Sequence, residues 1–203
     1  MSADRAGRVA GVVLAAGTSS RLGRNKLLLP LEGEPVLRRS VTSAMRAGLD
    51  PVIVVLGFEP DKARATLEGL SYKEVLNEQY EKGINSSVRL AIANVPDDAA
   101  AAVVMLPDMP FVTSEMLQTL VERYRSSTAP VVVSLYGDVN APPTLHDRSV
   151  FAEFFGQEVQ GCGRHIVRRH RDELEEVAWP ADALDDLDVP GDYESVTARL
   201  GAE

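Results

Sequence analysis

The sequence predicts a three-layer α/β domain with a mostly parallel sheet, on three observations. Apolar runs rich in β-branched residues recur along the 203-residue chain, at 9–14, 52–56, 101–106 and 131–135. These runs are nearly continuous rather than alternating, as expected for strands that are covered on both faces. Segments with the spacing of amphipathic helices separate them. Strands that alternate with helices indicate a parallel sheet wrapped by helices.

Helices are expected between and after these strands, in chain order. The first follows Pro35 and the second follows Thr113, a capping residue type. Beyond about residue 142 the pattern is less regular. There we expect helices at 149–155, 164–174 and 192–200, and a strand at 174–179. Residues 97–102 are expected to connect a helix to a strand. The apolar faces of the first two helices comprise Val36, Leu37, Val41, Ala44 and Met45, then Met116, Leu117, Leu120, Val121 and Tyr124.

Length, composition and charge narrow the classes of function. A chain of 203 residues that is 45% hydrophobic suits one domain, 1–203, with a substantial core. The formal net charge of -9 disfavours a nucleic-acid partner, because such proteins are usually basic. No apolar run approaches the roughly 20 residues of a membrane span, and no secretory signal is apparent. With one cysteine, Cys162, no intrachain disulfide can form. We therefore expect a cytoplasmic protein that binds neither nucleic acid nor membrane.

The loop after the first expected strand, LAAGTSSRLGRNK, combines small residues with basic ones. Backbone N–H groups of a glycine- and serine-rich loop can converge on an anion, and Arg21 and Lys26 can neutralise phosphate charge. The spacing matches neither GxxxxGK[ST] nor GxGxxG. A basic surface turn is the alternative. In an open parallel sheet, ligands bind beyond the carboxyl ends of the strands, so Asp108 is expected at the same edge.

The stretch LAAGTSSRLGRNKLLLPLEGEPVL resembles the LAAGxSxRMGxxK signature of MobA-like nucleotidyltransferases, and more narrowly the MocA-like molybdenum cofactor cytidylyltransferases. Leu22 stands where the family usually has Met. The resemblance implies a Rossmann-like nucleotidyltransferase topology, with this loop wrapped around an NTP. It places Arg21 and Lys26 on the phosphates, in catalytic roles. The nucleotide-binding candidates that it implies in this loop are Leu14, Ala15, Ala16, Gly17, Thr18, Arg21 and Lys26.

A second segment, NEQYEKGINSSV, is similar to the family's N-x-x-[WY]-x-x-G-x-x-x-S-[LV] element. The resemblance implies nucleotide contacts from Asn77, Gly83, Ser86 and Ser87. On physical grounds, Gly83 provides a turn, and Ser86 or Ser87 can cap a helix that runs to Ala93. A helix N-terminus at the pocket would favour an anion. Alternatively, both serines act only as caps.

Asp108 follows a buried strand directly, within LPDMPFV. Transfer of a phosphoryl group needs charge neutralisation, usually by Mg²⁺, which often takes only one or two protein carboxylates. A turn aspartate before Pro110 is the alternative. The stretch resembles the family's GDMPxV motif, with Pro107 in place of Gly, and the resemblance implies that Asp108 binds the metal and takes part in catalysis.

A further acidic stretch, LDDLDVPGDY, is similar to the family's DIDTPEDY. The resemblance implies a second metal ligand, for which we favour Asp188, with Asp186 as the alternative. A cluster that caps a helix entered at Pro190 is an equally open interpretation from the sequence alone.

The second substrate is expected against the C-terminal half. Asn140 and Pro142 lie where relatives carry a G-x-P element, and Asn140 departs from its glycine. Residues 160–164, QGCGR, match the family's GDxGAR poorly, and from them we carry over Arg164 as a contact to the acceptor's phosphate. A solvated helix face that pairs with nearby glutamates is the alternative for Arg164.

The resemblance implies Mg²⁺-dependent transfer of CMP from CTP to the phosphate of molybdopterin or the molybdenum cofactor, with release of pyrophosphate. The resemblance also implies a molybdenum hydroxylase apo-enzyme as a further partner. CTP is favoured because Ala16 makes LAAG, whereas guanylyl relatives more often have LAGG. Three alternatives remain: guanylyl transfer, a sugar-phosphate acceptor, and a non-catalytic carrier of the molybdenum cofactor.

Overall fold

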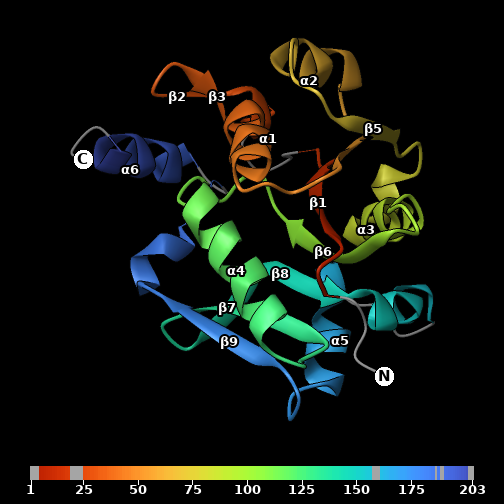
Figure 1. The fold of residues 1–203 in the computed structure, drawn as a ribbon. Helices are drawn as coiled ribbons and strands as arrows, with labels where there is room; N and C mark the ends of the chain where they lie inside the picture. Colours follow the sequence, from red (N-terminus) through yellow and green to blue (C-terminus); the bar gives the residue numbers. More distant parts are fainter. Residues whose placement is uncertain (1–4, 19–24, 157–160, 186, 188–189, 201–203) are drawn as a thin grey trace.

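The computed structural model describes residues 5–18, 25–156, 161–185, 187 and 190–200. Within them, a seven-stranded sheet has the order β5-β4-β1-β6-β8-β7-β9 (Figure 1). β8 runs antiparallel to both of its neighbours, and the other pairs are parallel. The strands are β1 (Arg8–Ala15), β4 (Val52–Leu56), β5 (Lys73–Leu76), β6 (Ala99–Met105), β7 (Val131–Tyr136), β8 (Val139–Asp147) and β9 (Glu175–Trp179).

Helices cover both faces of this sheet and make three layers. α1 (Val36–Arg46) and α4 (Ser114–Ser126) pack on one face, and α3 (Ile84–Ala93) and α5 (Arg164–Arg169) on the other. The remaining α-helices are α2 (Pro60–Thr66) and α6 (Pro190–Leu200). A small hairpin of β2 (Pro30–Leu31) and β3 (Glu34–Pro35) precedes α1. The 3₁₀ segments are η1 (Lys26–Leu28), η2 (Tyr80–Lys82), η3 (Arg148–Phe155), η4 (Gly161–Gly163) and η5 (Ala181–Leu184).

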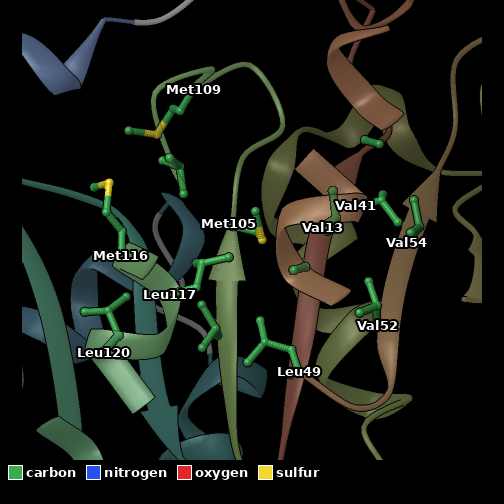
Figure 2. Packing of buried hydrophobic residues seen from close by; sticks show 14 of the residues in the cluster. Val13, Val41, Leu49, Val52, Val54, Met105, Met109, Met116, Leu117 and Leu120 are labelled. Atoms are coloured by element: carbon green, nitrogen blue, oxygen red, sulfur yellow. The ribbon is translucent and has the colours of Figure 1, made fainter. Parts of the chain in front are cut away.

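The central strands are continuous apolar runs because each faces a core on both sides. In β1, Val12 and Val13 are both fully buried, but they belong to different clusters. Val13 lies among Val54, Met105 and Leu117, under α1 and α4 (Figure 2). Val12 packs with the residues under α3 and α5. The sheet therefore separates two cores, and it holds the carboxyl ends of β5, β4, β1 and β6 side by side.

Two strands were not expected from the sequence. β5 lies at the edge of the sheet, and three of its four residues are exposed, so it lacks a continuous apolar run. β8 begins with exposed residues and contains Pro142 and Pro143, which cannot donate ladder hydrogen bonds. Side chains of β7 bond the carbonyl groups of the two prolines: the Ser134 hydroxyl donates to the Pro143 carbonyl (2.8 Å), and the Tyr136 hydroxyl donates to the Pro142 carbonyl (3.1 Å).

The four expected strands and the two amphipathic helices are present, and Thr113 caps α4 by accepting from the Met116 N–H (3.3 Å). Three other expectations need correction. The helix expected at 164–174 ends at Arg169, and the one at 149–155 lies within the 3₁₀ segment η3. Residues 99–102, expected as a connection, already belong to β6. No helix within the described ranges is both long and apolar enough to cross a bilayer.

Candidate active site

The opening loop and the Asp108 turn meet through an ion pair. The Lys26 Nζ lies 2.6 Å from the Asp108 Oδ2, and the two side chains are 13% and 18% exposed. Lys26 begins η1, and the buried Asn25 caps that turn by accepting from the Leu27 N–H (3.2 Å). Asp108 follows β6, the neighbour of β1 in the sheet. Two residues that are 82 positions apart therefore share one partly buried spot.

The start of the opening loop leads from the core to an open rim. Leu14, Ala15 and Ala16 are buried at the end of β1, whereas Gly17 and Thr18 are exposed. Apart from its two chain neighbours, no described residue lies within 4 Å of the position where a Cβ on Gly17 would stand. Among the described residues, the chain at Gly17 is therefore open above the end of β1. Arg21, which we expect on the phosphates, lies outside the described residues.

The acidic stretch near the C-terminus also reaches Asp108. The Leu187 N–H donates to the Asp108 carbonyl (3.2 Å), and the Leu187 side chain is fully buried. Asp186 and Asp188, the candidate second metal ligands, lie outside the described residues. Leu187, which stands between these two candidates in the sequence, is therefore bonded to the Asp108 turn.

The donor set at this spot fits a hard divalent cation. Asp108 supplies carboxylate oxygens, and Asp185 and Asp192 line the same cavity. The described part of the chain contains no cluster of three metal-ligating side chains. Mg²⁺ does not need one, because it is commonly held by one or two carboxylates together with substrate phosphates and water. The histidines and Cys162 are not required for such a site.

A cavity of about 590 Å³ opens beside Asp108. It contains all three residues expected to contact the second substrate: Asn140 and Pro142 from β8, and Arg164 from α5. Residues of η5 and α6 complete the wall, and the volume is within the range of small-molecule sites. The antiparallel strand β8 and the short helix α5 therefore converge on the Asp108 turn.

Arg164 is positioned by a glycine with positive φ. Gly163 precedes α5 at φ +94, and a Cβ there would stand 3.0 Å from the His146 Cε1 and 3.1 Å from the Phe154 ring.

The neighbouring Cys162 is largely buried, and this burial raises the pKa of its thiol to about 12. We therefore expect the thiol to stay protonated at neutral pH, which disfavours a role as a nucleophile.

Asn77 organises the second predicted nucleotide segment. Its buried side-chain amide donates to the Ser86 Oγ and the Ser87 Oγ, both at 2.9 Å, and its Oδ1 accepts from the Gln79 N–H (2.9 Å). α3 starts earlier than expected, after Gly83 at φ +89, and no side chain caps it. The expectation that Ser86 or Ser87 caps this helix is therefore wrong. Both serines lie inside its first turns, where they hold Asn77.

Sequence reasoning missed several residues that shape the site. Asn25 is a cap-type residue directly before Lys26, a signal that was available. Gly57 directly follows a buried strand, a position that often marks close backbone approach. Asp192 lines the cavity because α6 folds back over it, which local sequence does not reveal.

Curated proteins of known sequence include relatives over most of the chain. It is 30% identical to the purine catabolism protein PucB of Bacillus subtilis (strain 168), over 94% of this chain and 96% of PucB. It is 25% identical to the bifunctional protein GlmU of Staphylococcus epidermidis over 86% of this chain. The aligned region covers only 34% of the length of GlmU, so this chain spans about a third of that relative.

Among solved structures, Rv0371c from Mycobacterium tuberculosis H37Rv matches with a TM-score of 0.83 at 30% identity, over 95% of this chain and 99% of that one. A complex of Rv0371c with manganese matches with a TM-score of 0.79 at 29% identity, over 94% and 98% of the two chains. The model of the MobA-like NTP transferase domain matches residues 11–174. The chain therefore belongs to the MobA-like NTP transferase family, with the α/β nucleotidyltransferase fold.

Proposed function

We propose that this chain transfers CMP from CTP to the phosphate of molybdopterin or the molybdenum cofactor. The observation that carries the proposal is the Lys26–Asp108 pair at the edge of a cavity that also contains Arg164. A phosphate-binding cation, a carboxylate suited to a divalent metal and a second cation thus lie around one space. This arrangement suits two anionic substrates that must meet.

In the proposed reaction, an oxygen of the acceptor's phosphate attacks the α-phosphorus of CTP. A new P–O bond forms, the bond between the α-phosphorus and the bridging oxygen breaks, and pyrophosphate leaves with the electron pair. The attacking phosphate is already ionised, so no protein base is needed. Catalysis then rests on positioning and on charge stabilisation.

The residues divide these tasks. Lys26 and Arg21 bind the phosphates of CTP, and Arg164 holds the acceptor's phosphate beside Asn140 and Pro142. Asp108, with Asp188, would hold Mg²⁺. When bound, the metal neutralises charge on the triphosphate and on the departing pyrophosphate. Ala15, Ala16 and Gly17 face the base and ribose, and the further nucleotide contacts come from Leu14, Thr18, Asn77, Gly83, Ser86 and Ser87.

Two comparisons support parts of this proposal. The manganese complex of Rv0371c supports a divalent cation in this family. The name of PucB, a purine catabolism protein, is consistent with a recipient apo-enzyme that hydroxylates purines with a molybdenum cofactor. The nucleotide is inferred from Ala16, since the cytidylyl branch of the family reads LAAG at this position.

The test combines purified protein and Mg²⁺ with molybdopterin and each of CTP, GTP, UTP and ATP, and measures pyrophosphate. Release with CTP and molybdopterin alone would support the proposal. Release with GTP, or with a sugar phosphate as acceptor, would reassign the substrate. Tight molybdopterin binding without release from any nucleotide would indicate a carrier.

The Asp108→Asn variant tests the role of the Asp108 carboxylate. It keeps the size of the side chain and removes the charge, so we expect at least a 100-fold loss of turnover with an unchanged circular dichroism spectrum. Turnover at the wild-type rate would contradict the role of Asp108.

A further inference from the structure

We propose that Gly57 is a positioning residue that sets the spacing between the two halves of the nucleotide site. The inference rests on the proposed function, which places nucleotide contacts in residues 14–18 and 77–87. Gly57 belongs to neither segment. It directly follows β4, which lies between β1 and β5 in the sheet.

Gly57 is in closer contact with its surroundings than any side chain would allow. A Cβ at this position would stand 2.7 Å from the Tyr80 Cβ, 2.8 Å from the Ala16 Cβ and 2.9 Å from the Ala16 carbonyl oxygen. Real Cβ atoms essentially never approach other atoms to less than 3.0 Å. Because the three contacts are to Cβ and backbone atoms, no rotamer change can relieve them.

The residues on either side of Gly57 are bonded to the two halves of the site. The Phe58 N–H donates to the Ala16 carbonyl (3.2 Å), and the Asn77 N–H donates to the Leu56 carbonyl (2.8 Å). The Phe58 ring also lies 6.4 Å from the Tyr80 ring, tilted by 59°. Residues 56–58 therefore form a bridge, with Ala16 on one side and the chain from Asn77 to Tyr80 on the other.

A methyl group at Gly57 has to push these two halves apart. Ala16 lies at the end of β1, where the cradle for the base begins, and Tyr80 leads through η2 into Gly83 and α3. The acceptor cavity is formed by other elements: β8, α5, η5 and α6. The nucleotide side of the site should therefore respond to the substitution, whereas the acceptor side should not.

The experiment measures CTP binding to the full chain in the presence of Mg²⁺ by isothermal titration calorimetry, for wild type, Gly57→Ala and Gly156→Ala. Gly156 is the matched control, since the nearest atom to its Cβ position is the Glu153 carbonyl oxygen at an ordinary 3.5 Å, and its backbone is extended. We expect the Kd for CTP to rise about tenfold in Gly57→Ala and to stay at the wild-type value in Gly156→Ala. In turnover, KM for CTP should rise while KM for the acceptor does not change.

A second variant, Phe58→Ala, tests the same inference in case Gly57→Ala does not fold. Phe58→Ala keeps the glycine and the backbone bonds but removes the ring beside Tyr80, and we expect it to raise the Kd for CTP about threefold. Wild-type CTP affinity in both variants would overturn the inference, as would equal increases in KM for CTP and for the acceptor. Failure of this inference can be distinguished from failure of the proposed transfer reaction. If wild type binds CTP but releases no pyrophosphate, the transfer reaction fails, and the Kd values for CTP of wild type and Gly57→Ala can still be compared.

Discussion

Lys26 and Asp108 form the contact on which the proposed chemistry depends. This ion pair, at 2.6 Å, is less exposed to water than the other ion pairs among the described residues, so solvent screens it less. The Lys26 ammonium group is thus paired with the carboxylate of Asp108, which we expect to hold a divalent cation. Nucleotide phosphates can draw Lys26 away, so metal and nucleotide should bind together more readily than metal alone.

Replacing Lys26 with glutamine should therefore strengthen binding of metal in the absence of nucleotide. We expect Lys26→Gln to bind Mn²⁺ several-fold more tightly than wild type, because Asp108 loses a competing cation. Electron paramagnetic resonance of free Mn²⁺ gives the affinity directly. Lys73→Gln is the control, because Lys73 is exposed at the sheet edge and donates to the Asn94 carbonyl. Equal Mn²⁺ affinity in wild type and Lys26→Gln would show that the pair does not compete with metal.

His146 is a second residue with a measurable consequence. It is fully buried on β8, and its ring packs edge-on against Phe154 at 5.0 Å. Neither ring nitrogen has a hydrogen-bond partner among the described residues. Burial, together with the positive charge that the nearby His165 and His170 can carry, lowers the pKa of His146 to about 3.

The low pKa of His146 should make the free energy of unfolding depend on pH in acidic solution. The unfolded chain takes up a proton on His146 near pH 6.5, whereas the folded chain does so only near pH 3. The free energy of unfolding should therefore be insensitive to this group above pH 6.5 and fall below it. Between pH 7 and pH 4.5 the loss should be about 2 kcal/mol larger in wild type than in His146→Gln. Urea unfolding at several pH values measures it, and parallel pH profiles would contradict the assignment.

At the scale of elements, α6 lines the cavity, and Arg199 and Tyr193 connect this helix to other elements. Arg199 donates to the Asp182 carbonyl (2.8 Å), pairs with the Asp185 carboxylate and stacks 4.1 Å above the Phe111 ring. The Tyr193 hydroxyl donates to the Pro30 carbonyl on the β2–β3 hairpin. Arg199 thus ties the last helix to η5 and to the chain just after Asp108.

Loosening α6 should impair binding of the acceptor specifically. We expect Arg199→Gln to raise KM for the acceptor about threefold to tenfold and to leave the Kd for CTP unchanged, because α6 lines the acceptor cavity. The cost in stability should be about 1 kcal/mol, given the exposure of these groups. Arg123→Gln serves as the control, since it breaks an exposed pair between Arg123 on α4 and Glu175 on β9, and Arg123 is not among the residues that line the cavity. An unchanged KM for the acceptor in Arg199→Gln would rule out this role for α6.

At the scale of the whole molecule, one sheet joins the two cores. β1 contributes alternate residues to both clusters, so neither can unfold without exposing the other. The chain has one tryptophan, Trp179, at the end of β9 on the sheet edge. It reports on the part of the sheet farthest from β5.

Unfolding in urea should therefore be a single transition. We expect Trp179 fluorescence and far-ultraviolet circular dichroism to give the same midpoint within error, as two-state domains do. An earlier fluorescence midpoint would show that β7, β8 and β9 unfold separately from the parallel half.

Much of the parallel half can be predicted from the sequence, because strands buried on both faces carry their own signal. Val52–Leu56 is apolar at every position, and its bounds agree with expectation. β8 could not be predicted in this way. It contains polar residues and prolines, so it lacks both the continuous apolar run and the full set of N–H donors by which a central strand is identified. The start of α3 was misplaced because Gly83, rather than a serine, precedes the helix.

The sequence by itself determined the alternation of buried strands and helices, and the residue types, Lys26, Asp108 and Arg164, that suit charged substrates. These follow from local physics: periodicity, capping and the chemistry of single side chains. Only the tertiary structure decided that Lys26 touches Asp108, that Arg164 and Asn140 face the same cavity, and that Gly57 separates Ala16 from Tyr80. Such contacts join residues far apart in the chain, and their distances depend on how the whole sheet packs.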